Sequence, residues 1–412
     1  MDAADITDLA TPAGELLLAE VTEQLATSSE LSVLERMGAR VGAARASAAV
    51  AQVSLRAKAV AKFGPVDADR MFFTATGLEQ ATRARVATHR AAVAADRVGA
   101  KTPLTDLGCG LGADLIAFAR AGFDVIGVES DPLTAACAAA NLRSLGLAGR
   151  VVVGDATGFE RPTGDVVFCD PARRDDRGRV FDLAKMTPPW PFVLELLAGT
   201  ACVKVGPGIA HRDVPSMAAG TPVTAEWVSD DATVTEACLR SGRLAGPAGA
   251  GRTFSATVLR SADPDGSTIA GDPAVRASAG ALGKYLYEPD GAVIRAGLIG
   301  TLAPTLDAHL LDDQIAYLTS PVLTRSVFAR PYRILEELPH RTKALKAAVR
   351  ARGIGTLTIK KRGVDVDPAM LRRELLGARG YGSATATIVL TRRAGRGVAL
   401  LVEPVEPVDA VG

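Results

Sequence analysis

Cysteine is scarce in this chain, which has five among 412 residues. They stand singly along the sequence, as Cys109, Cys137, Cys169, Cys202 and Cys238. An odd and scattered set excludes a disulfide framework, and no two of them have the close spacing of a zinc site. We therefore expect a protein of a reducing compartment that binds no metal.

The sequence also lacks a charge excess and long apolar runs. Its 47 basic and 46 acidic residues leave a formal net charge of +1, so any affinity for nucleic acid must come from a local patch. No apolar run is long enough to span a bilayer, and the first five residues lack the basic start of a secretion signal. These absences predict a cytoplasmic protein without a membrane partner.

A glycine-rich loop follows the first strand pattern of the chain. Residues 103–107 have the composition of a buried parallel strand, and Gly108, Gly110 and Gly112 follow it. Glycine at every second position permits a tight turn and a close approach of the backbone to a ligand. Residues 113–121 then form a helix whose free N–H groups face that ligand. The pattern predicts the first half of a nucleotide-binding β-α-β unit.

Acidic residues around the loop indicate which cofactor it holds. Residues 125–128 form the second strand, and Glu129 at its carboxyl end can accept hydrogen bonds from two ribose hydroxyls. The loop spacing is G-x-G-x-G, not the G-x-G-x-x-G of dinucleotide sites, and Asp106 and Asp114 flank it. Two carboxylates would repel a pyrophosphate but suit the cationic S-adenosylmethionine. S-adenosylmethionine is therefore the expected cofactor.

Strand, loop and acid recur farther along the chain. Residues 150–153 form a third strand, after which Asp155 can reach an adenine amino group. Residues 165–169 are a fourth apolar run that leads to Asp170, and residues 200–205 are a fifth. Because ligands bind at the carboxyl ends of parallel strands, we expect these acids at one edge of one sheet.

Together these motifs resemble the class I S-adenosylmethionine-dependent methyltransferases, and the resemblance covers residues 101–262. It implies an α/β, Rossmann-like methyltransferase domain with a mostly parallel seven-stranded sheet. It also implies a role for each matching position. Asp106 with Gly108, Gly110 and Gly112 would hold the methionine portion, Glu129 the ribose, Asp155 with Ala156 the adenine, and Asp170 would face the methyl group.

Such domains resemble one another in ending with an antiparallel strand pair, for which the sequence offers three candidates. Residues 225–229, 233–240 and 252–259 have strand patterns, with Gly and Pro between the last two. A different antiparallel layer or a separate small sheet would also fit them. Residues 263–275 then form a polar, breaker-rich linker.

The first hundred residues predict a helical N-terminal domain. Residues 1–100 are rich in alanine and lack strand patterns, and residues 77–98 carry apolar side chains at helical spacing. The segment that begins at Thr76 has the capping-box form that would start this helix. Just before it, Phe72 and Phe73 are expected to pack on the catalytic domain, although their rings could also stack on a substrate.

Residues 276–412 predict a smaller α+β C-terminal domain. Strand patterns at residues 327–335 and 356–359 enclose a helix over residues 342–352. Residues 385–391 and 397–402 form a terminal hairpin.

Positive charge is concentrated in this domain between residues 331 and 363, where nine Lys and Arg stand against two Glu. Lys360, Lys361 and Arg362 belong to this excess, which is of the kind that binds phosphate backbones. The segment resembles the THUMP-like C-terminal domain of a group of bacterial methyltransferases. Because THUMP domains proper bind RNA, the resemblance implies an RNA partner. A solvated helix face with a charged loop would give the same pattern.

The loop after the fourth strand differs from the motif of amino-directed nucleic-acid methyltransferases. Those enzymes resemble one another in an Asp/Asn-Pro-Pro-aromatic loop, whose ring stacks on a flipped base. This chain has Asp170-Pro171-Ala172-Arg173, and the missing aromatic argues against methylation of an exocyclic amine. Arg173 and Arg174 could grip a phosphate or a carboxylate, or pair with the acids that follow them.

The fifth strand supplies two further candidates. RNA uridine-C5 methyltransferases resemble one another in an Asp-Pro-Pro-Arg loop and a cysteine nucleophile just after that strand. Cys202 is the nearby cysteine here, but it falls inside the strand, so we interpret it as a core residue. Lys204, at the strand end, could bind an anionic substrate, take a proton or cap the strand at the surface.

The sequence therefore predicts an S-adenosylmethionine-dependent methyltransferase that modifies RNA by in-line displacement. The candidate catalytic residues are Asp170 and Lys204, and the candidate substrate contacts are Arg173, Arg174, Lys360, Lys361 and Arg362. Two alternatives remain open. One is a small-molecule methyltransferase with a structural basic domain, and the other is a non-catalytic RNA- or partner-binding protein that retains the fold.

Overall fold

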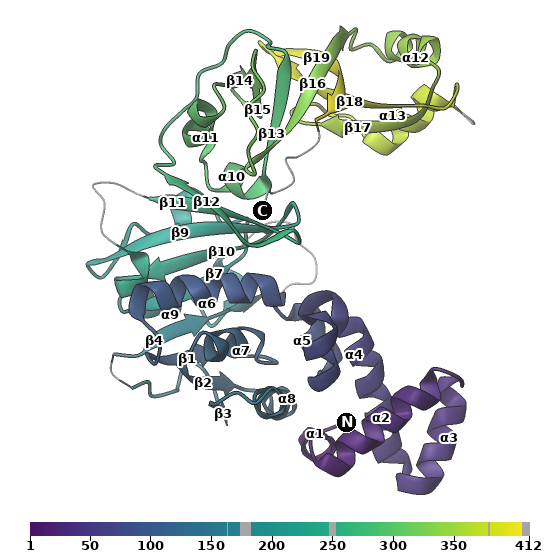
Figure 1. Ribbon diagram of the computed structural model, residues 1–412. Helices are drawn as coiled ribbons and strands as arrows, with labels where there is room; N and C mark the ends of the chain where they lie inside the picture. The colour runs from purple at the N-terminus through teal and green to yellow at the C-terminus, as the bar shows by residue number, and fades with distance from the viewer. Residues whose placement is uncertain (163, 174–182, 247–252, 378–379, 406–412) are drawn as a thin grey trace. The chain divides into compact units, whose positions relative to one another are not determined.

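The computed structural model describes residues 1–162, 164–173, 183–246, 253–377 and 380–405. The chain divides into two compact units (Figure 1). The first comprises Met1–Thr224 and Ala237–Ala248, and the second comprises Ala225–Glu236 and Gly249–Gly412. Over the described ranges, no helix is both long enough and apolar enough to cross a membrane.

The first unit begins with helices, as its alanine-rich composition predicts. They are α1 (Ala3–Leu9), α2 (Pro12–Leu25), α3 (Glu30–Val41), α4 (Ala43–Arg70), α5 (Ala75–Gln80) and α6 (Ala84–Val98). Side chains of Asp2, Thr11 and Ser29 accept backbone N–H bonds at the starts of the first three helices, so each begins where the sequence supplies a cap.

The helix predicted over residues 77–98 is instead two helices. α5 starts earlier than the capping-box pattern at Thr76 predicts, because Thr74 caps it by accepting a 3.0 Å hydrogen bond from the Gly77 N–H. α5 ends at Gln80, and the backbone of residues 81–83 is not helical before α6 begins. Thr82 stands in this break with its side chain buried.

Met71, Phe72 and Phe73 have no exposed surface (0%). The Gln52 amide donates to the Phe73 carbonyl over 2.7 Å and accepts from its N–H over 2.9 Å. Asn141 bonds the backbone of Phe72 in the same way, over 3.1 and 2.6 Å. The interpretation of this cluster as a packed anchor is confirmed. The substrate-stacking alternative is wrong, because neither ring has any surface to offer.

The first unit contains a mixed sheet with the strand order β3-β2-β1-β4-β7-β10. The strands are β1 (Pro103–Leu107), β2 (Asp124–Glu129), β3 (Arg150–Val153), β4 (Val166–Cys169), β7 (Ala201–Val205) and β10 (Thr233–Ser241). The pairs β1–β2, β1–β4, β2–β3 and β4–β7 are parallel, whereas β10 runs antiparallel to β7. The carboxyl ends of β1, β2, β3, β4 and β7 therefore share one edge.

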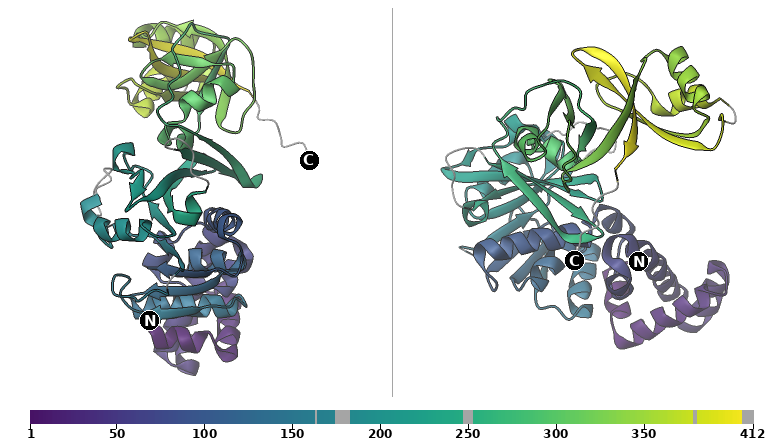
Figure 2. Two further views of the ribbon diagram at one scale, coloured as in Figure 1. Left: turned by 90° about the vertical axis from the view of Figure 1, so that its left-hand side faces the viewer. Right: turned by 45° about the horizontal axis from the view of Figure 1, so that its top comes forward.

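Three helices connect the parallel strands: α7 (Ala113–Arg120), α8 (Pro132–Ser144) and α9 (Trp190–Leu197). The N-terminal helices lie beside this sheet in Figure 2, and their buried side chains join those of α7, α8 and the strands in one core. The predicted Rossmann-like α/β fold is confirmed, with a sheet that is mixed rather than purely parallel.

The predicted linker over residues 263–275 is wrong for most of its length. Asp263–Gly271 form strand β12, which pairs antiparallel with β11 (Phe254–Arg260), and β11 pairs in parallel with β9 (Thr221–Asp230). β12 is the last strand of its sheet, and an edge strand tolerates breakers such as Pro264. A 2.7 Å hydrogen bond between the hydroxyls of Thr257 and Thr268 adds to the pairing.

The rest of the second unit is a sheet with the strand order β14-β15-β13-β16-β19-β18-β17. The strands are β13 (Tyr285–Pro289), β14 (His309–Asp312), β15 (Ile315–Ser320), β16 (Ala329–Leu338), β17 (Ile354–Lys361), β18 (Ala384–Arg393) and β19 (Arg396–Pro404). The helices are α10 (Gly291–Arg295), α11 (Ile299–Thr305), α12 (Thr342–Ala351) and α13 (Pro368–Leu376). The strands, the helix and the terminal hairpin predicted between residues 327 and 402 all form. Apolar side chains of α12 and α13 pack in one core with those of the strands.

Candidate active site

Asp106 lies near the carboxyl end of β1 with 1% of its surface exposed. Neither carboxylate oxygen has a hydrogen-bond partner in the described part of the chain. Burial, followed by the nearby Asp170 carboxylate, raises the pKa of Asp106 to about 8. A buried carboxyl without a partner is costly in the free protein. It fits a ligand that brings a cationic hydrogen-bond donor, as the methionine portion of S-adenosylmethionine does.

Gly108, Gly110 and Gly112 form the predicted loop between β1 and α7, with φ values of 82°, 56° and 83°. These left-handed conformations favour glycine. A Cβ atom added at Gly108 or Gly110 would meet nothing within 4 Å, so the loop borders open space. The Gly110 N–H donates to Glu129 Oε2 over 2.9 Å, and Glu129 Oε1 accepts from the Asp131 N–H over 3.0 Å. The loop and the acid at the end of β2 therefore form one structure.

Asp155 and Ala156 follow β3 at the same sheet edge. One oxygen of Asp155 accepts hydrogen bonds from the backbone N–H and the hydroxyl of Thr157, over 2.8 and 2.9 Å. These bonds hold the pKa of Asp155 below its usual range. They fix the carboxylate as an ionised acceptor and leave its second oxygen for a ligand.

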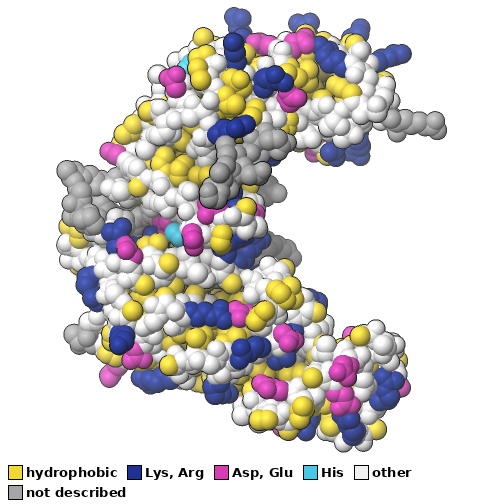
Figure 3. All heavy atoms as spheres, in the orientation of Figure 1, with side chains coloured by type: hydrophobic (Ala, Val, Ile, Leu, Met, Phe, Trp, Pro, Cys, Tyr) yellow, Lys and Arg dark blue, Asp and Glu magenta, His cyan; other side chains and the backbone are white. Residues whose placement is uncertain are grey.

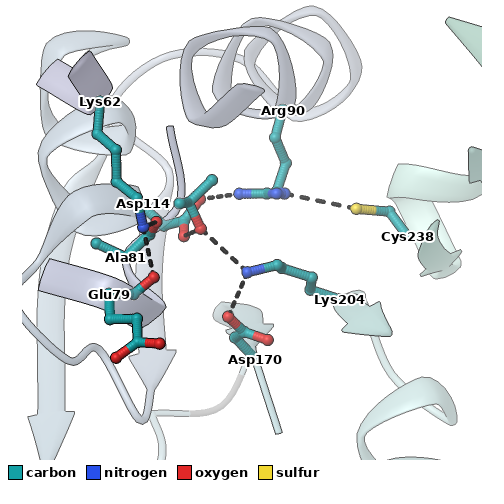
Figure 4. Close-up of polar contacts among 9 residues, drawn as sticks. Lys62, Glu79, Ala81, Arg90, Asp114, Asp170, Lys204 and Cys238 are labelled. Atoms are coloured by element: carbon teal, nitrogen blue, oxygen red, sulfur yellow. Dashed lines mark hydrogen bonds and ion pairs between the residues drawn. The ribbon is translucent and has the colours of Figure 1, made fainter. Parts of the chain in front are cut away.

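Asp170 follows β4, and Lys204 lies near the end of the adjacent strand β7. Lys204 Nζ donates to Asp170 Oδ2 over 2.5 Å, and the two side chains are 16% and 35% exposed (Figure 4). The parallel sheet thus joins the two residues that the sequence predicts as catalytic. An ion pair of this kind holds a carboxylate in one orientation while leaving its other oxygen open.

Known proteins share this arrangement of motifs. A methyltransferase domain model matches residues 105–172, which include the glycine loop and Asp170. Two proteins of Mycobacterium tuberculosis, from strains CDC 1551 / Oshkosh and ATCC 25618 / H37Rv, are each 35% identical to the chain over 362 residues. Both are named uncharacterized S-adenosylmethionine-dependent methyltransferases, and each match covers 86% of this chain and 95% of the relative. The chain belongs to the S-adenosylmethionine-dependent methyltransferases.

Further similarities concern the fold of this methyltransferase. A crystal structure from Porphyromonas gingivalis W83, described as a candidate methyltransferase, matches with a TM-score of 0.75 at 22% identity, covering 96% of this chain and 99% of that one. A model of a THUMP domain-like domain matches residues 329–404, so the predicted THUMP-like resemblance is confirmed. A model of a domain of unknown function matches residues 2–59.

A buried polar chain leads away from Lys204 in this methyltransferase, and no sequence motif marks it (Figure 4). Lys204 Nζ donates to Thr82 Oγ1 over 3.1 Å, and Thr82 donates to Asp114 Oδ2 over 2.8 Å. Asp114 Oδ1 pairs with Arg90, whose guanidinium lies 4.9 Å from the centre of the Phe168 ring. Asp114 was expected to face the cofactor. That expectation is wrong, because protein groups already bind both of its oxygens.

Lys62 of α4 holds the segment that carries Thr82. Its Nζ donates to three backbone carbonyls at the end of α5, those of Leu78, Glu79 and Ala81, over 2.8, 2.5 and 2.8 Å. An ammonium group has three protons, so each carbonyl can receive one. Burial lowers the pKa of Lys62. Lys62 therefore acts as a C-terminal cap of α5.

Three other candidates have different outcomes. Arg173 ends the short strand β5 (Ala172–Arg173), which pairs with β6 (Met186–Thr187), and its contact with a substrate stays a prediction. Arg174 lies outside the described residues. Cys202 is 2% exposed within β7, so its interpretation as a core residue is confirmed.

The predicted basic contacts of the second unit are partly engaged. Lys360 Nζ lies 2.5 Å from Glu288 Oε2. Arg362 donates to the Ala316 carbonyl over 3.1 Å, and its guanidinium lies 5.0 Å from the centre of the Tyr317 ring. Lys361 is exposed. Lys360 and Arg362 thus bind neighbouring strands of their own sheet.

Exposed cations gather on α12. Lys343, Lys346 and Arg350 stand at positions i, i+3 and i+7, so they share one exposed helix face. None of the three pairs with an acid among the residues that the structure describes. The acids of β16 are paired elsewhere, Glu336 with Arg352 and Glu337 with Arg393. Figure 3 shows Lys and Arg side chains projecting from the end of the second unit that holds α12.

Proposed function

We propose that this methyltransferase transfers the methyl group of S-adenosylmethionine to RNA. The observation that carries the RNA substrate is the exposed face of α12, where Lys343, Lys346 and Arg350 keep their charge without an internal acid. Such surfaces bind phosphodiester backbones and release the counterions of the nucleic acid. The THUMP-like match over residues 329–404 includes α12 and supports the same partner.

The proposed cofactor site follows the carboxyl ends of β1, β2 and β3. Asp106 accepts from the ammonium group of the methionine portion beside the glycine loop. Glu129 accepts from the ribose hydroxyls, and Asp155 with Ala156 holds the adenine. The support for these roles is that Asp106 has no protein partner for either oxygen and that the loop borders open space.

Asp170 is the proposed acceptor-facing residue. S-adenosylmethionine supplies a methyl group activated by its sulfonium, so the protein has to orient the acceptor and assist its deprotonation. Lys204 holds Asp170 Oδ2, while Oδ1 makes no hydrogen bond within the described ranges. The second oxygen can therefore receive the acceptor's hydrogen bond or proton. Arg173, Arg174 and Lys361 are proposed phosphate contacts.

Labelled S-adenosylmethionine and fractionated RNA, protein and metabolites from cells that lack this protein provide the test. The protein should label the RNA fraction, and its RNA binding should weaken steeply as salt concentration rises. A variant with Lys343→Ala, Lys346→Ala and Arg350→Ala should bind RNA about tenfold or more weakly, with a salt dependence shallower by up to about three charges. A matched control, Lys58→Ala with Lys101→Ala and Arg143→Ala, removes three exposed cations from the first unit and should bind like the unaltered protein.

Other outcomes would favour the alternatives. Label confined to the metabolite fraction would favour a small-molecule methyltransferase. Cofactor binding without label in any fraction would favour a non-catalytic protein. Equal RNA affinity of the two triple variants would remove α12 from the proposal.

A further inference from the structure

We infer that Thr82 is a positioning residue of this active site, which holds the ammonium group of Lys204 against Asp170. The N-terminal helices supply Thr82 from the break between α5 and α6. The inference rests on the proposed acceptor-facing role of Asp170 and extends that site to a group from outside the Rossmann-like fold.

The hydrogen bonds through Thr82 have a single possible direction. A lysine ammonium can only donate and a carboxylate can only accept, whereas a threonine hydroxyl has one proton and two lone pairs. Thr82 therefore gives its one proton to Asp114 Oδ2 over 2.8 Å. Its lone pairs face Lys204 Nζ, which donates over 3.1 Å. The hydroxyl is thereby fixed as an acceptor for Lys204.

Arg90 fixes the far end of this chain. It pairs with Asp114 Oδ1, and both residues are buried, at 1% and 6% exposure. The positive charge favours the ionised form of Asp114, which can accept from Thr82 but cannot donate to it. Phe168 of β4 lies under the guanidinium and limits its movement. Thr82 thus has a rigid partner on the side away from Lys204.

The backbone around Thr82 is held as firmly as its side chain. Ala81 and Arg83 have φ values of −56° and −65° with ψ of 138°, so the segment is extended and Thr82 turns inward between two helices. Lys62 donates to the Ala81 carbonyl over 2.8 Å, next to Thr82. Thr82 itself is 8% exposed. These contacts place the hydroxyl beside Lys204 without any contribution from a ligand.

The consequence for Lys204 is a selected side-chain orientation. Lysine has a flexible four-carbon stem, and one partner alone leaves it free to rotate. Thr82 and Asp170 bind Nζ over 3.1 and 2.5 Å, which defines its position from two sides. The third ammonium proton makes no bond with another described residue, so Lys204 can donate it to the methyl acceptor.

The test compares Thr82→Val with Thr82→Ser in the full-length protein. Valine keeps the shape without the hydroxyl, whereas serine keeps the hydroxyl. Acetic anhydride labelling followed by peptide mass spectrometry measures the reactivity of Lys204 without knowledge of the substrate. Lys204 should react about threefold or more faster in Thr82→Val and at the original rate in Thr82→Ser, since only the hydroxyl accepts from Nζ. The exposed Lys343 serves as an internal reference.

A second measurement follows methyl transfer and cofactor affinity. Thr82→Val should lower kcat about tenfold to 100-fold, because misplacement of a positioned group costs this much. The Kd for S-adenosylmethionine should change less than about twofold, since Thr82 contacts none of the proposed cofactor residues. Thr82→Ser should recover most of kcat.

Equal Lys204 labelling in the unaltered protein and Thr82→Val would overturn the inference, and so would equal losses of kcat and cofactor affinity. If Thr82→Val does not fold, Thr82→Ala removes the hydroxyl with less steric demand and should give the same labelling increase. If RNA receives no methyl group, the proposed RNA substrate fails while the labelling result still decides the role of Thr82.

Discussion

Lys204 Nζ lies 2.5 Å from Asp170 Oδ2, which joins the ends of β7 and β4. Asp106, at the end of β1 between them and β2, has no such partner. The sheet edge thus holds one carboxylate that the protein has neutralised and one that it has not. We infer that the first serves the methyl acceptor and the second the cationic cofactor.

Asp106→Asn and Glu129→Gln should each weaken binding of S-adenosylmethionine about 30-fold or more. The reason for Asp106 is that loss of one partner of a buried charge pair costs about 2 to 5 kcal/mol. Glu129 should lose its ribose hydrogen bonds and its bond from Gly110. Isothermal calorimetry measures both affinities. Asp165→Asn, a change outside the proposed cofactor site, should bind normally, and equal affinity in all three variants would refute the site.

Cofactor affinity should rise with pH between about 6 and 8. The pKa of Asp106 is raised from 3.8 to about 8, so below pH 8 the free protein holds a proton that the cationic cofactor must displace. The rise should be at most about tenfold per pH unit and should level off above pH 8. Calorimetry in buffers of different ionisation enthalpy should detect the released proton. Asp106→Asn should bind weakly at every pH without this proton release.

The same group should lower the stability of the free protein as pH rises. Between about pH 4 and pH 8 the folded state keeps the Asp106 proton that the unfolded chain has released. The folded state then binds more protons, so its free energy of unfolding falls across this window. Urea titrations at several pH values measure the slope. Asp106→Asn should flatten it, and an unchanged slope in that variant would contradict the buried, partnerless carboxyl.

Asn141→Ala should lower the free energy of unfolding by about 2 kcal/mol or more. Asn141 is fully buried (0% exposed), and its amide donates to the Phe72 and Leu111 carbonyls over 3.1 and 2.9 Å. Alanine would leave these buried groups unpaired, at about 1 to 3 kcal/mol each. Ser144→Ala, at the other end of the same helix face, should cost less than about 0.5 kcal/mol. Equal urea midpoints for both variants would argue against this link between the N-terminal helices and the glycine loop.

The sequence predicts the part of the site that local pattern determines. The glycine loop, Glu129 and Asp170 each follow an apolar strand, and parallel pairing brings all strand ends to one edge. Asp106 is found for the same reason. Its lack of a partner could not be predicted, because that depends on what the neighbouring elements do not supply.

The rest depends on contacts between distant segments. Thr82 and Lys204 are 122 positions apart, and neither the break after α5 nor the cap from Lys62 has a sequence signature. The charge run was found, but Lys360 pairs with Glu288, 72 positions earlier. Residues 263–271 contain breakers that favour a linker, yet pairing with β11 makes them a strand. Tertiary contacts outweigh local preference in each case.

Methyl transfer by the unaltered protein and by Asp170→Asn tests the account most directly. Both should bind S-adenosylmethionine with affinities within about twofold of each other, since Asp170 faces the acceptor. Labelled cofactor with RNA from cells lacking the protein should give labelled RNA with the unaltered protein, and a rate about 10² to 10⁴ lower with Asp170→Asn. Equal labelling by both proteins, or label in no RNA with either, would contradict the account.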